Sequence, residues 1–441
     1  TAGSANMLVY TRALMGIGGA FIMPSTLSII TNVFTDPAER GKAIGIWAGV
    51  SALGVGLGPV TGGFLLSHFW WGSVFLVNVP VIAIGLVGGW FLVPDSRDPS
   101  APKLDPVGAL LSIAGLAVLL WAVIEAPSHG WGSGGIIGGF VLGALILGGF
   151  VAWELTYDSP MLDIHFFENP RFTAASGAIT LTFFTLFGSL FLMTQYLQSV
   201  LGYSALKAGS VLLPQAAVLM VTAFSSSVMV QRFGNKLVVA FGLAVVAIAM
   251  LLFGLLDVAT PMWQVILISC VLGLGMGNVM APATDSIMGS LPREKAGVGS
   301  AMNDTTRQVG GAVGVAVLGS ILSSKYRSSV VHLSALQHFP AQLTTGIKDN
   351  VGQAIAVSHS TGAGALGGAL AAVARRSYVD AFHVAVLVGA VVMLIAAACV
   401  LKWLPARAGD EAKVFTERPV HPEIELDPEP PAVPAAVFER S

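Results

Sequence analysis

The chain alternates between long apolar runs and short polar connectors. Eleven of the runs are long enough to cross a bilayer core of about 30 Å as a helix of about 20 residues. They lie at residues 6–33, 43–66, 74–93, 106–124, 135–153, 172–198, 206–230, 237–256, 263–289, 299–322 and 381–403. Polar connectors such as "TDPAERGK" and "QRFGNK" separate many of them. This pattern predicts an all-α polytopic membrane protein with eleven transmembrane helices.

Two regions depart from the pattern. Residues 323–380 are rich in Gly, Ala and Ser with scattered charges, and we expect a long external loop in which 351–374 lies as a helix at the membrane interface. From residue 404 the chain contains "PEIELDPEPPAVP", which is rich in proline and acidic residues and has no apolar period. Such a composition cannot bury enough apolar surface to order itself, so residues 404–441 are predicted to be a disordered tail.

Composition agrees with a membrane location and narrows the chemistry. Of the 441 residues, 54% are hydrophobic and 10% are charged, whereas a soluble domain carries about 25% charged residues. No basic cluster suggests nucleic acid as a partner, and the eight histidines show no ligand spacing. Cys270 and Cys399 both fall in apolar runs, where unpaired buried thiols are expected. The sequence has no Gly-rich loop ending in Lys-Ser/Thr to bind ATP phosphates. We therefore expect no enzyme activity, metal or cofactor.

The distribution of basic residues predicts the orientation in the membrane. If the span 6–33 runs inward, every second connector faces the cytoplasm, where Lys and Arg accumulate. Those connectors hold nine basic residues against one, Lys207, in the short connectors of the other side: Arg40, Lys42, Arg97, Lys103, Arg171, Arg232, Lys236, Arg293 and Lys295. A cytoplasmic tail and a place in the cell membrane follow from this orientation.

An internal repeat relates the first and ninth spans. "GIGGAFIMPSTLSI…DPAERGKAIG" matches "GLGMGNVMAPATDSI…LPREKAGVG" in its glycines, in a later proline (Pro24 and Pro282) and in the loop. Chance likeness between two glycine-rich spans is the alternative. Copies separated by an even number of spans run in the same direction, as in the parallel halves of the major facilitator fold. Two spans follow the second copy, so the first copy is also the fourth helix of its half, and the repeat predicts six, two and six helices with three in front of residue 1.

Five stretches carry a resemblance to a known family. "RALMGIGGA", "GVGLGPVTGG", "WWGSVFLVNVP", "ELTYDSPMLDIHFFENPRF" and "YLQSVLGYSALKAGSVLLP" occur in the order of its motifs. The chain up to about residue 404 resembles the fourteen-helix drug:proton antiporters of the major facilitator superfamily, the EmrB/QacA type, without their first three helices. Met15 stands where the family's fourth-helix motif often has Gln. The resemblance implies export of hydrophobic or cationic drugs in exchange for protons, with the proton gradient as the energy source.

These expectations divide the chain into four parts. Residues 1–93 form an incomplete N-terminal half, 94–171 a two-helix insert with connecting loops, 172–403 a six-helix C-terminal half, and 404–441 a cytoplasmic tail. Two rival functions remain: a dedicated exporter of one metabolite or antibiotic, and a membrane receptor or scaffold that transports nothing.

A stripe of glycines marks the span 43–66. Gly54, Gly58 and Gly62 recur at i, i+4 and i+8, which places them on one helix face where another backbone can approach closely. Pro59 forfeits a backbone hydrogen bond and bends the helix. Together with Gly63 they form the motif that the resemblance links to a seal against leak. Ordinary tight packing is the alternative. The seal predicts that leucine at position 58 harms export more than leucine at position 310.

Ionisable residues inside spans are the candidates for proton coupling. The purely apolar part of the tenth span, residues 309–322, is about 21 Å long at 1.5 Å per residue and cannot cross about 30 Å. Asp304 and Arg307 are therefore drawn into the membrane, where they can pair at i, i+3 and the carboxylate can carry a proton. The alternative is a solvated pair at the cytoplasmic end of a short helix.

Three further sets of residues complete the candidate site. The resemblance implies a part in proton coupling for Arg12, which can also reach the interface by snorkelling. Asp285 lies near the cytoplasmic end of its span, where plain solvation competes with a coupling role. The aromatic residues Phe183, Phe184, Phe187 and Phe191 offer apolar and cation-binding surface for a substrate. Contact with the core or with lipid is the alternative for most of them.

Overall fold

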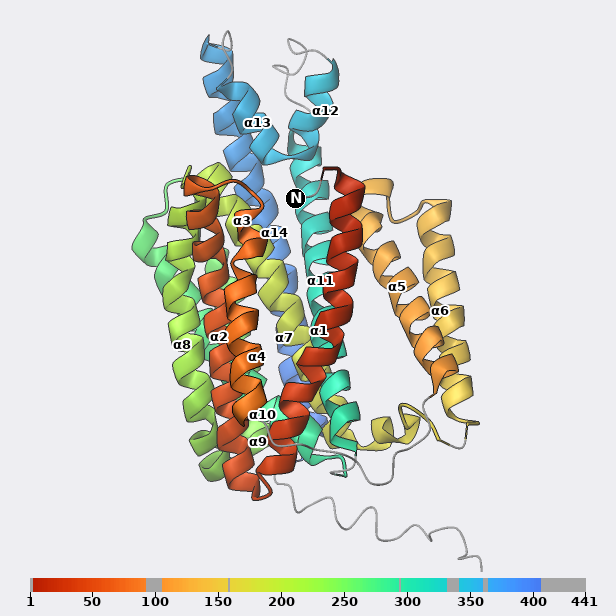
Figure 1. Ribbon diagram of the computed structural model, residues 1–441. Coiled ribbons are helices and arrows are strands. Elements are labelled where there is room, and N and C mark those ends of the chain that lie inside the picture. Colours follow the sequence, from red (N-terminus) through yellow and green to blue (C-terminus); the bar gives the residue numbers. More distant parts are fainter. Residues whose placement is uncertain are drawn as a thin grey trace, which may run out of the picture.

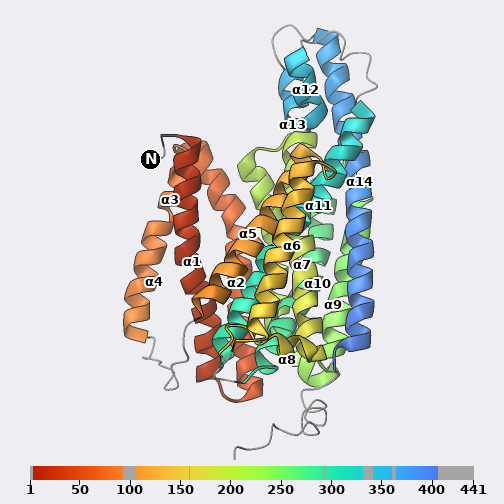
Figure 2. The ribbon, with the colours of Figure 1, turned by 90° about the vertical axis from the view of Figure 1, so that its right-hand side faces the viewer.

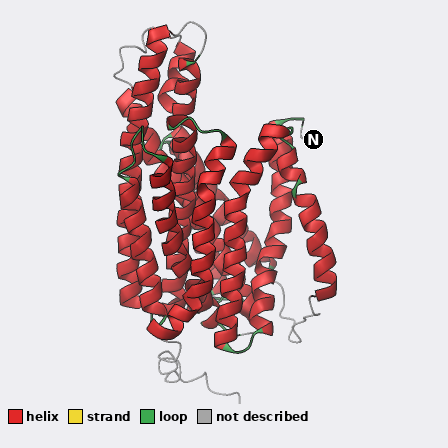
Figure 3. Ribbon diagram, turned by 90° about the vertical axis from the view of Figure 1, so that its left-hand side faces the viewer, coloured by secondary structure: helices red, strands yellow, loops and turns green. Residues whose placement is uncertain are grey.

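The computed structural model describes residues 3–92, 105–157, 159–292, 295–330, 341–359 and 364–405. Within these ranges the regular structure is helical throughout, and Figure 3 shows how little of the described chain lies in loops. Among the described residues, eleven candidate spans are long and apolar enough to cross a membrane, which confirms the number expected from the apolar runs. The predicted disordered tail lies outside the described residues from 406 onward.

The helices follow one another with short connections. Their bounds are α1 Ala5–Val33, α2 Pro37–His68, α3 Ser73–Leu76, α4 Asn78–Leu92, α5 Pro106–His129, α6 Gly134–Glu154, η1 Ile164–Glu168, α7 Pro170–Gln195, η2 Tyr196–Val200, α8 Ala205–Phe233, α9 Asn235–Phe253, α10 Met262–Gly289, α11 Ala296–Val330, α12 Ala341–Asp349, α13 Val351–Ser358 and α14 Gly364–Trp403. The two short elements η1 and η2 are a 3₁₀ helix and a π-helix that flank α7.

Three of the long helices begin with the same local device. Asp36, Asp105 and Asn169 each precede a proline that opens the helix, and the side chain of each accepts hydrogen bonds from backbone N–H groups of the first turn. The fixed φ of proline suits the first helical position, and the capping oxygen satisfies N–H groups that have no partner in the helix. These caps set where α2, α5 and α7 start.

The two ends of the bundle carry different elements. In Figure 1 the start of α1 lies at the same end as α12 and α13, while α14 finishes at the opposite end, where the connections into α2, α7 and α9 also lie. All of the described connectors expected in the cytoplasm therefore share one end of the bundle. Which end faces the cytoplasm stays a prediction.

Each repeat copy packs the first of its two helices against the second helix of the other copy. The repeat equates α1 with α10 and α2 with α11. In the structure α1 packs against α11, and α10 packs against α2. If α1 is exchanged with α10 and α2 with α11, the α1–α11 contact becomes the α10–α2 contact. A two-fold relation between the halves requires this correspondence. The repeated Pro24 and Pro282 each lie inside their helix.

The main apolar core lies among α7 to α14, and smaller clusters join it to the N-terminal helices. Leu27 and Ile44 pack with Met288 and Ala296, which links α1 and α2 to α10 and α11. By contrast, only 6% of the residues in the most apolar stretch of α1 are buried. In the span formed by α3 and α4, none of the residues in the corresponding stretch is buried. Apolar surface of this kind is what a membrane-spanning helix presents to lipid.

The region 323–380 differs from the expected loop. It begins inside α11, includes α12 and α13, and ends in α14, which starts at Gly364 rather than near 381. The expectation of one interfacial helix over 351–374 is wrong, because α13 ends at Ser358 and α14 begins six residues later. The run "ALAAVARRSYVDAF" contains strong helix formers and no proline, so the helix continues through its charges. Figure 2 shows α12, α13 and the adjoining ends of α11 and α14 projecting beyond the other helices.

Helices α5 and α6 form an antiparallel pair beside this bundle. They approach closely because α6 presents glycines to α5: a Cβ at Gly143 would lie 3.1 Å from the backbone nitrogen of Leu119. The turn between them is tied to α11, since Trp131 Nε1 donates a hydrogen bond of 2.6 Å to Ser320 Oγ. The pair is therefore fixed to the bundle at the end where α12 and α13 lie.

Candidate transport site

Arg307 on α11 lies between two aromatic rings from other helices. Its Cζ is 4.6 Å from the ring centre of Trp47 on α2 and 5.0 Å from that of Phe183 on α7. Its Nη2 donates a hydrogen bond of 3.1 Å to Thr284 Oγ1 on α10. A guanidinium over aromatic faces gains about 0.5–2 kcal/mol per contact, more when it is shielded from water. Four helices thus meet at one cation.

Asp304 lies one turn before Arg307, and the charges of the two side chains act on each other. The ion pairs found in the described part of the chain do not include a direct contact between them, so the pairing expected at i, i+3 is an electrostatic interaction without a hydrogen-bonded ion pair. Arg307 instead directs its hydrogen bond to a hydroxyl on α10 and lies against two rings. Asp304 Oδ2 is closed off from solvent and has no hydrogen-bond partner.

Two polar side chains shortly before Asp304 on the same helix also have unsatisfied atoms. Asn303 Nδ2 and Ser300 Oγ have no partner, and both residues are fully buried. The amide oxygen of Asn303 accepts a hydrogen bond of 3.2 Å from Thr284 Oγ1. Buried polar atoms without partners are rare in folded proteins because each costs about 1–3 kcal/mol. Their concentration here is typical of a place that binds water, protons or a ligand.

The four candidate phenylalanines of α7 do not share one environment. Phe183 and Phe184 are buried, whereas Phe187 and Phe191 are each 38% exposed. Phe183 faces Arg307, and its ring centre lies 6.0 Å from that of Phe187. The structure therefore brings Phe183 and Phe187 to the cluster. Phe191 lies further along, where it contacts the position of Gly319.

Asp285 on α10 pairs with Arg40 at the start of α2. Arg40 Nε lies 3.2 Å from Asp285 Oδ1, and the two side chains are only 14% and 24% exposed. The pair joins α2 of one repeat copy to α10 of the other at the end of the bundle where α14 finishes. Asp285 is thus engaged with a cation, rather than simply solvated.

Arg12 lies apart from this cluster. Its side chain is exposed, and its Cζ sits 5.6 Å from the ring centre of Phe75 on α3. Among the described residues, the structure brings Arg12 together with an aromatic ring of the N-terminal helices and not with Asp304 or Asp285.

The glycines of α2 make their close contact on a different face from the expected one. A Cβ at Gly54, Gly58 or Gly62 would have no described atom of another element within 4 Å. Gly56 instead meets Ala216 of α8, and a Cβ at Gly63 would lie 2.8 Å from the backbone nitrogen of Leu206. The close contact with α8 thus uses other glycines of the same stretch, and a role of the stripe Gly54, Gly58 and Gly62 in a seal stays a prediction.

Pro59 belongs to the same α2–α8 contact. A Cβ at Gly209 of α8 would lie 2.8 Å from the carbonyl carbon of Pro59, so the glycine on α8 is what lets the proline turn approach. The contact continues along α2 through Gly49 and Gly45, which face Phe224 and Ser227 of α8. Small residues on both helices thus create a long, close interface.

A second close interface lies between α7 and α11. A Cβ at Gly310 would overlap the carbonyl of Thr180, and one at Gly314 would overlap the carbonyl of Phe184. Gly58 has open space by the same test. For folding, this packing favours the opposite order, with leucine at 310 the more harmful change, while the order expected for export stays a prediction.

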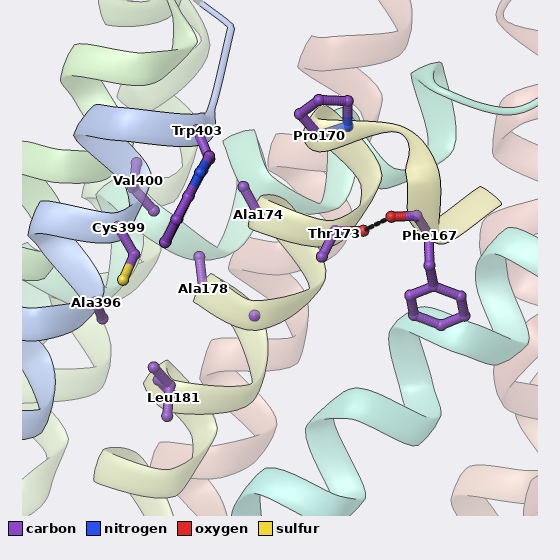
Figure 4. A pocket seen from close by; sticks show the side chains of 11 residues that line it. Phe167, Pro170, Thr173, Ala174, Ala178, Leu181, Ala396, Cys399, Val400 and Trp403 are labelled. Carbon is purple, nitrogen blue, oxygen red and sulfur yellow. Dashed lines mark hydrogen bonds between the residues drawn. The ribbon is translucent and has the colours of Figure 1, made fainter. Parts of the chain in front are cut away.

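An apolar cavity of about 520 Å³ lies between α7 and α14 (Figure 4), and Arg307 is not among its lining residues. Small residues of both helices line its walls, with Phe167 and Trp403 among the larger side chains at its edge. The Thr173 hydroxyl on its wall already donates a hydrogen bond of 2.6 Å to the carbonyl of Phe167. Sequence reasoning did not anticipate this cavity, because its walls are ordinary apolar residues far apart in the chain.

The part of Trp47 and Thr284 in this site was also not predicted from the sequence. Each lies in a run of apolar and small residues and carries no distinguishing spacing. Trp47 Nε1 also donates a hydrogen bond of 3.3 Å to Thr26 Oγ1 on α1, so this one indole links α1, α2 and α11. A signal was present in the repeat, because Trp47 and Thr284 each lie near the loop motif that the two copies share.

Comparison with known proteins agrees with this architecture. The model of the major facilitator superfamily matches residues 1–315. The multidrug efflux pump LfrA of Mycolicibacterium smegmatis is 38% identical over 400 residues, which is 90% of this chain and 78% of the relative. The tetracenomycin C resistance and export protein of Streptomyces glaucescens is 32% identical over 403 residues, 90% of this chain and 75% of the relative. The methyl viologen resistance protein SmvA of Salmonella typhimurium is 31% identical over 362 residues, 81% of this chain and 72% of the relative.

A bundle of membrane-spanning helices with crossed repeat contacts and a buried charged cluster defines a multi-pass membrane transporter. The chain belongs to the major facilitator superfamily. It is a transporter and not an enzyme.

Proposed function

We propose that this transporter is a proton-coupled exporter of hydrophobic or cationic compounds in the cell membrane, of the fourteen-helix drug:proton antiporter type. The observation that carries the proposal is the carboxylate of Asp304. It lies on a membrane-spanning helix, and its Oδ2 is shielded from solvent and lacks a hydrogen-bond partner. Ionisable groups at such positions are costly and are retained for ion or substrate pathways. The relatives named for multidrug efflux and for methyl viologen resistance support the class of substrate.

In this mechanism Asp304 alternates between two states. As a carboxylate, Asp304 attracts a cationic or polarisable substrate that enters from the cytoplasmic side. Phe183 and Phe187, which lie at the Arg307 cluster, supply apolar and cation-binding surface for this substrate. Uptake of a proton from outside neutralises Asp304, and the substrate loses its counter-charge and leaves. When the site faces the cytoplasm again, the proton departs and the carboxylate is restored. Arg307, fixed by Thr284 and two rings, keeps a positive charge close to this cycle.

Movement between the two states requires interfaces that seal and separate. In the facilitator fold the two halves rock about a substrate bound near the midplane. We assign the seal to the α2–α8 contact around Pro59 and Gly63, and a cytoplasmic latch to Arg40 and Asp285. Six of the nine basic residues lie in described parts of the chain at the end of the bundle where α14 finishes, and they support placing that end, and the tail, in the cytoplasm: Arg40, Lys42, Arg171, Arg232, Lys236 and Lys295.

The test replaces Asp304 in the gene at its own locus. Asp304→Asn keeps size and polarity but cannot titrate, so gradient-driven accumulation of a fluorescent cationic dye in inside-out vesicles should fall to background while dye binding persists. Asp304→Glu should keep part of the transport. Asp257→Asn, at an exposed position beyond α9, is the control and should transport normally. Normal gradient-driven accumulation by Asp304→Asn would remove Asp304 from the mechanism and leave Asp285 as the candidate.

Export of a single compound is the second candidate function. The relative named for tetracenomycin C resistance and export favours it. Growth of the deletion strain on a panel of chemically unrelated cations separates the two, because a multidrug exporter loses resistance to several compounds and a dedicated exporter to one.

A further inference from the structure

Two carboxylates meet at the end of the α5–α6 pair opposite the Trp131 anchor. Asp105 caps the start of α5 and Glu154 ends α6, and the two residues are only 7% and 3% exposed. They close around Gly108: a Cβ there would overlap Asp105 Oδ2 and would lie 2.6 Å from Glu154 Oε1. Only a glycine at this position lets the two oxygens converge.

Asp105 is supplied with hydrogen-bond donors. Its Oδ1 accepts a bond of 2.8 Å from the backbone N–H of Gly108, and Trp153 Nε1 lies 3.1 Å from both of its oxygens. The carboxylate also sits at the N-terminus of α5, where the helix dipole favours a negative charge. These features suit an ionised aspartate.

Glu154 is differently placed. Its Oε2 accepts a hydrogen bond of 3.0 Å from the backbone N–H of Leu162, whereas its Oε1 is shielded from solvent and has no partner. The charged groups that act on Glu154 within the described ranges are Asp105 and Asp163, both acidic. Asp163 lies 2.8 Å from His165 Nδ1 and is engaged with that ring. An ionised Glu154 would therefore be buried beside negative charge with one oxygen unsatisfied.

We propose that Asp105 and Glu154 hold one proton between them, bound to Glu154 Oε1 and donated to Asp105 Oδ2. Like charges this close cannot both ionise without a large cost, and a shared proton removes one charge and satisfies the orphan oxygen in a single hydrogen bond. The other oxygen of Glu154 still accepts from Leu162. The result is a ring of hydrogen bonds that joins α5, α6 and the segment leading to α7.

The proton acts as a clamp on this end of the hairpin. While it is bound, the pair is held at both ends: Trp131 ties the turn between the helices to α11, and the shared proton ties Asp105 of α5 to Glu154 of α6. Loss of the proton leaves two buried anions facing each other, and the ends of the helices separate. A metal cation would need more oxygen ligands than the two carboxylates offer. No group of three metal-binding side chains occurs within the parts of the chain that the structure describes.

Infrared difference spectroscopy of the purified protein in nanodiscs tests the proton directly. Glu154→Gln should abolish one carboxylic acid C=O band at neutral pH, a band that shifts in D₂O. Asp105→Asn should move the same band, because the acceptor changes. Glu125→Gln, at the other end of α5 and 38% exposed, is the matched control and should leave that band in place. An unchanged carboxylic acid spectrum in Glu154→Gln would overturn the proposal.

Thermal unfolding across pH supplies a second measurement. The wild-type midpoint should fall as pH rises through the loss of the shared proton. Glu154→Gln should be flat over the same range, because its amide donates to Asp105 at every pH. The wild-type unfolding midpoint could instead rise with the concentration of sodium or potassium chloride and not with that of protons. This result would mean that a metal cation, rather than a proton, lies between the carboxylates, and it would overturn the proposal.

Discussion

Trp47 and Arg307 face each other across 4.6 Å from helices that the internal repeat makes equivalent, α2 and α11. The second helix of one copy thus meets the second helix of the other at the buried charged cluster. The contact is asymmetric in chemistry: one copy contributes an aromatic face and the other a cation. A duplicated framework has in this way acquired a site that neither copy holds alone.

Removal of the Trp47 ring should show how much its contact with the Arg307 guanidinium contributes to the free energy of unfolding. Trp47→Ala should lower the free energy of unfolding by about 1–2 kcal/mol beyond the cost of lost packing, whereas Trp47→Phe should retain most of it. In an Arg307→Gln background the extra loss should vanish. Thermal unfolding in detergent measures all four proteins of this cycle. Trp263→Ala, at a 65% exposed position, is the control. Equal losses in both backgrounds would mean that the cation and the ring are not coupled.

The Arg40–Asp285 pair should be energetically coupled, unlike an exposed pair. A double-mutant cycle with Arg40→Gln and Asp285→Asn should give a coupling of about 0.5–3 kcal/mol. The matched control is Arg327–Asp349, a pair of 2.7 Å whose side chains are 56% and 44% exposed. Exposed pairs are typically worth under about 1 kcal/mol. A smaller coupling in the shielded pair than in the exposed one would contradict its assignment as a latch.

Alanine should be tolerated at Gly58 and harmful at Gly310. At Gly310 the added methyl group overlaps the carbonyl of Thr180, and overpacking of this kind costs about 1–3 kcal/mol. At Gly58 nothing described lies within 4 Å, and replacing glycine inside a helix gains up to about 1 kcal/mol. The unfolding midpoint and the yield of folded protein measure both effects. Equal destabilisation by the two variants would argue against this packing.

The orientation can be read from single cysteines in a background without Cys270 and Cys399. A cysteine at position 130 should react with an impermeant thiol reagent added to intact cells. Cysteines at 100 and 235 should react only after the cells are opened. The physical reason is the bias of Lys and Arg to connectors on the side of 100 and 235. Labelling of position 235 from outside would invert the proposed orientation.

The number of spanning helices was predictable because bilayer thickness imposes a length that can be counted along the sequence. The same counting placed Asp304 and Arg307 inside a helix, and α11 indeed begins at Ala296. The extension of α14 was missed because its apolar run stops at Arg375, Arg376 and Asp380, although helix-forming residues continue. Apolar length thus predicts how much of a helix lies in lipid, but not where the helix ends.

The partners of the site residues were beyond the sequence. Whether Arg307 meets Asp304 or Thr284 depends on how close α10 comes to α11, and that distance is set by contacts between helices. The glycines that contact α8 were beyond the sequence for the same reason, since Gly56 and Gly63 are distinguished from Gly54 and Gly58 only by the position of α8. Spacing within one helix defines faces, whereas the neighbours decide which face is used.

The length of α14 has a consequence for the outer surface of the cell. Forty residues of helix extend about 60 Å, twice the thickness of the hydrocarbon layer of about 30 Å. In the orientation that we propose, the end of α14 lies near the inner interface and its excess length stands above the outer one, beside α12 and α13, with a hydrogen bond from Tyr326 of α11 to the carbonyl of Ile347 of α12. This orientation predicts a helical mast, formed by the projecting parts of α11 to α14, on the external side. An antibody fragment raised against this mast would hold the molecule without touching the bundle, and it would give a small membrane protein the mass and asymmetry that single-particle imaging needs.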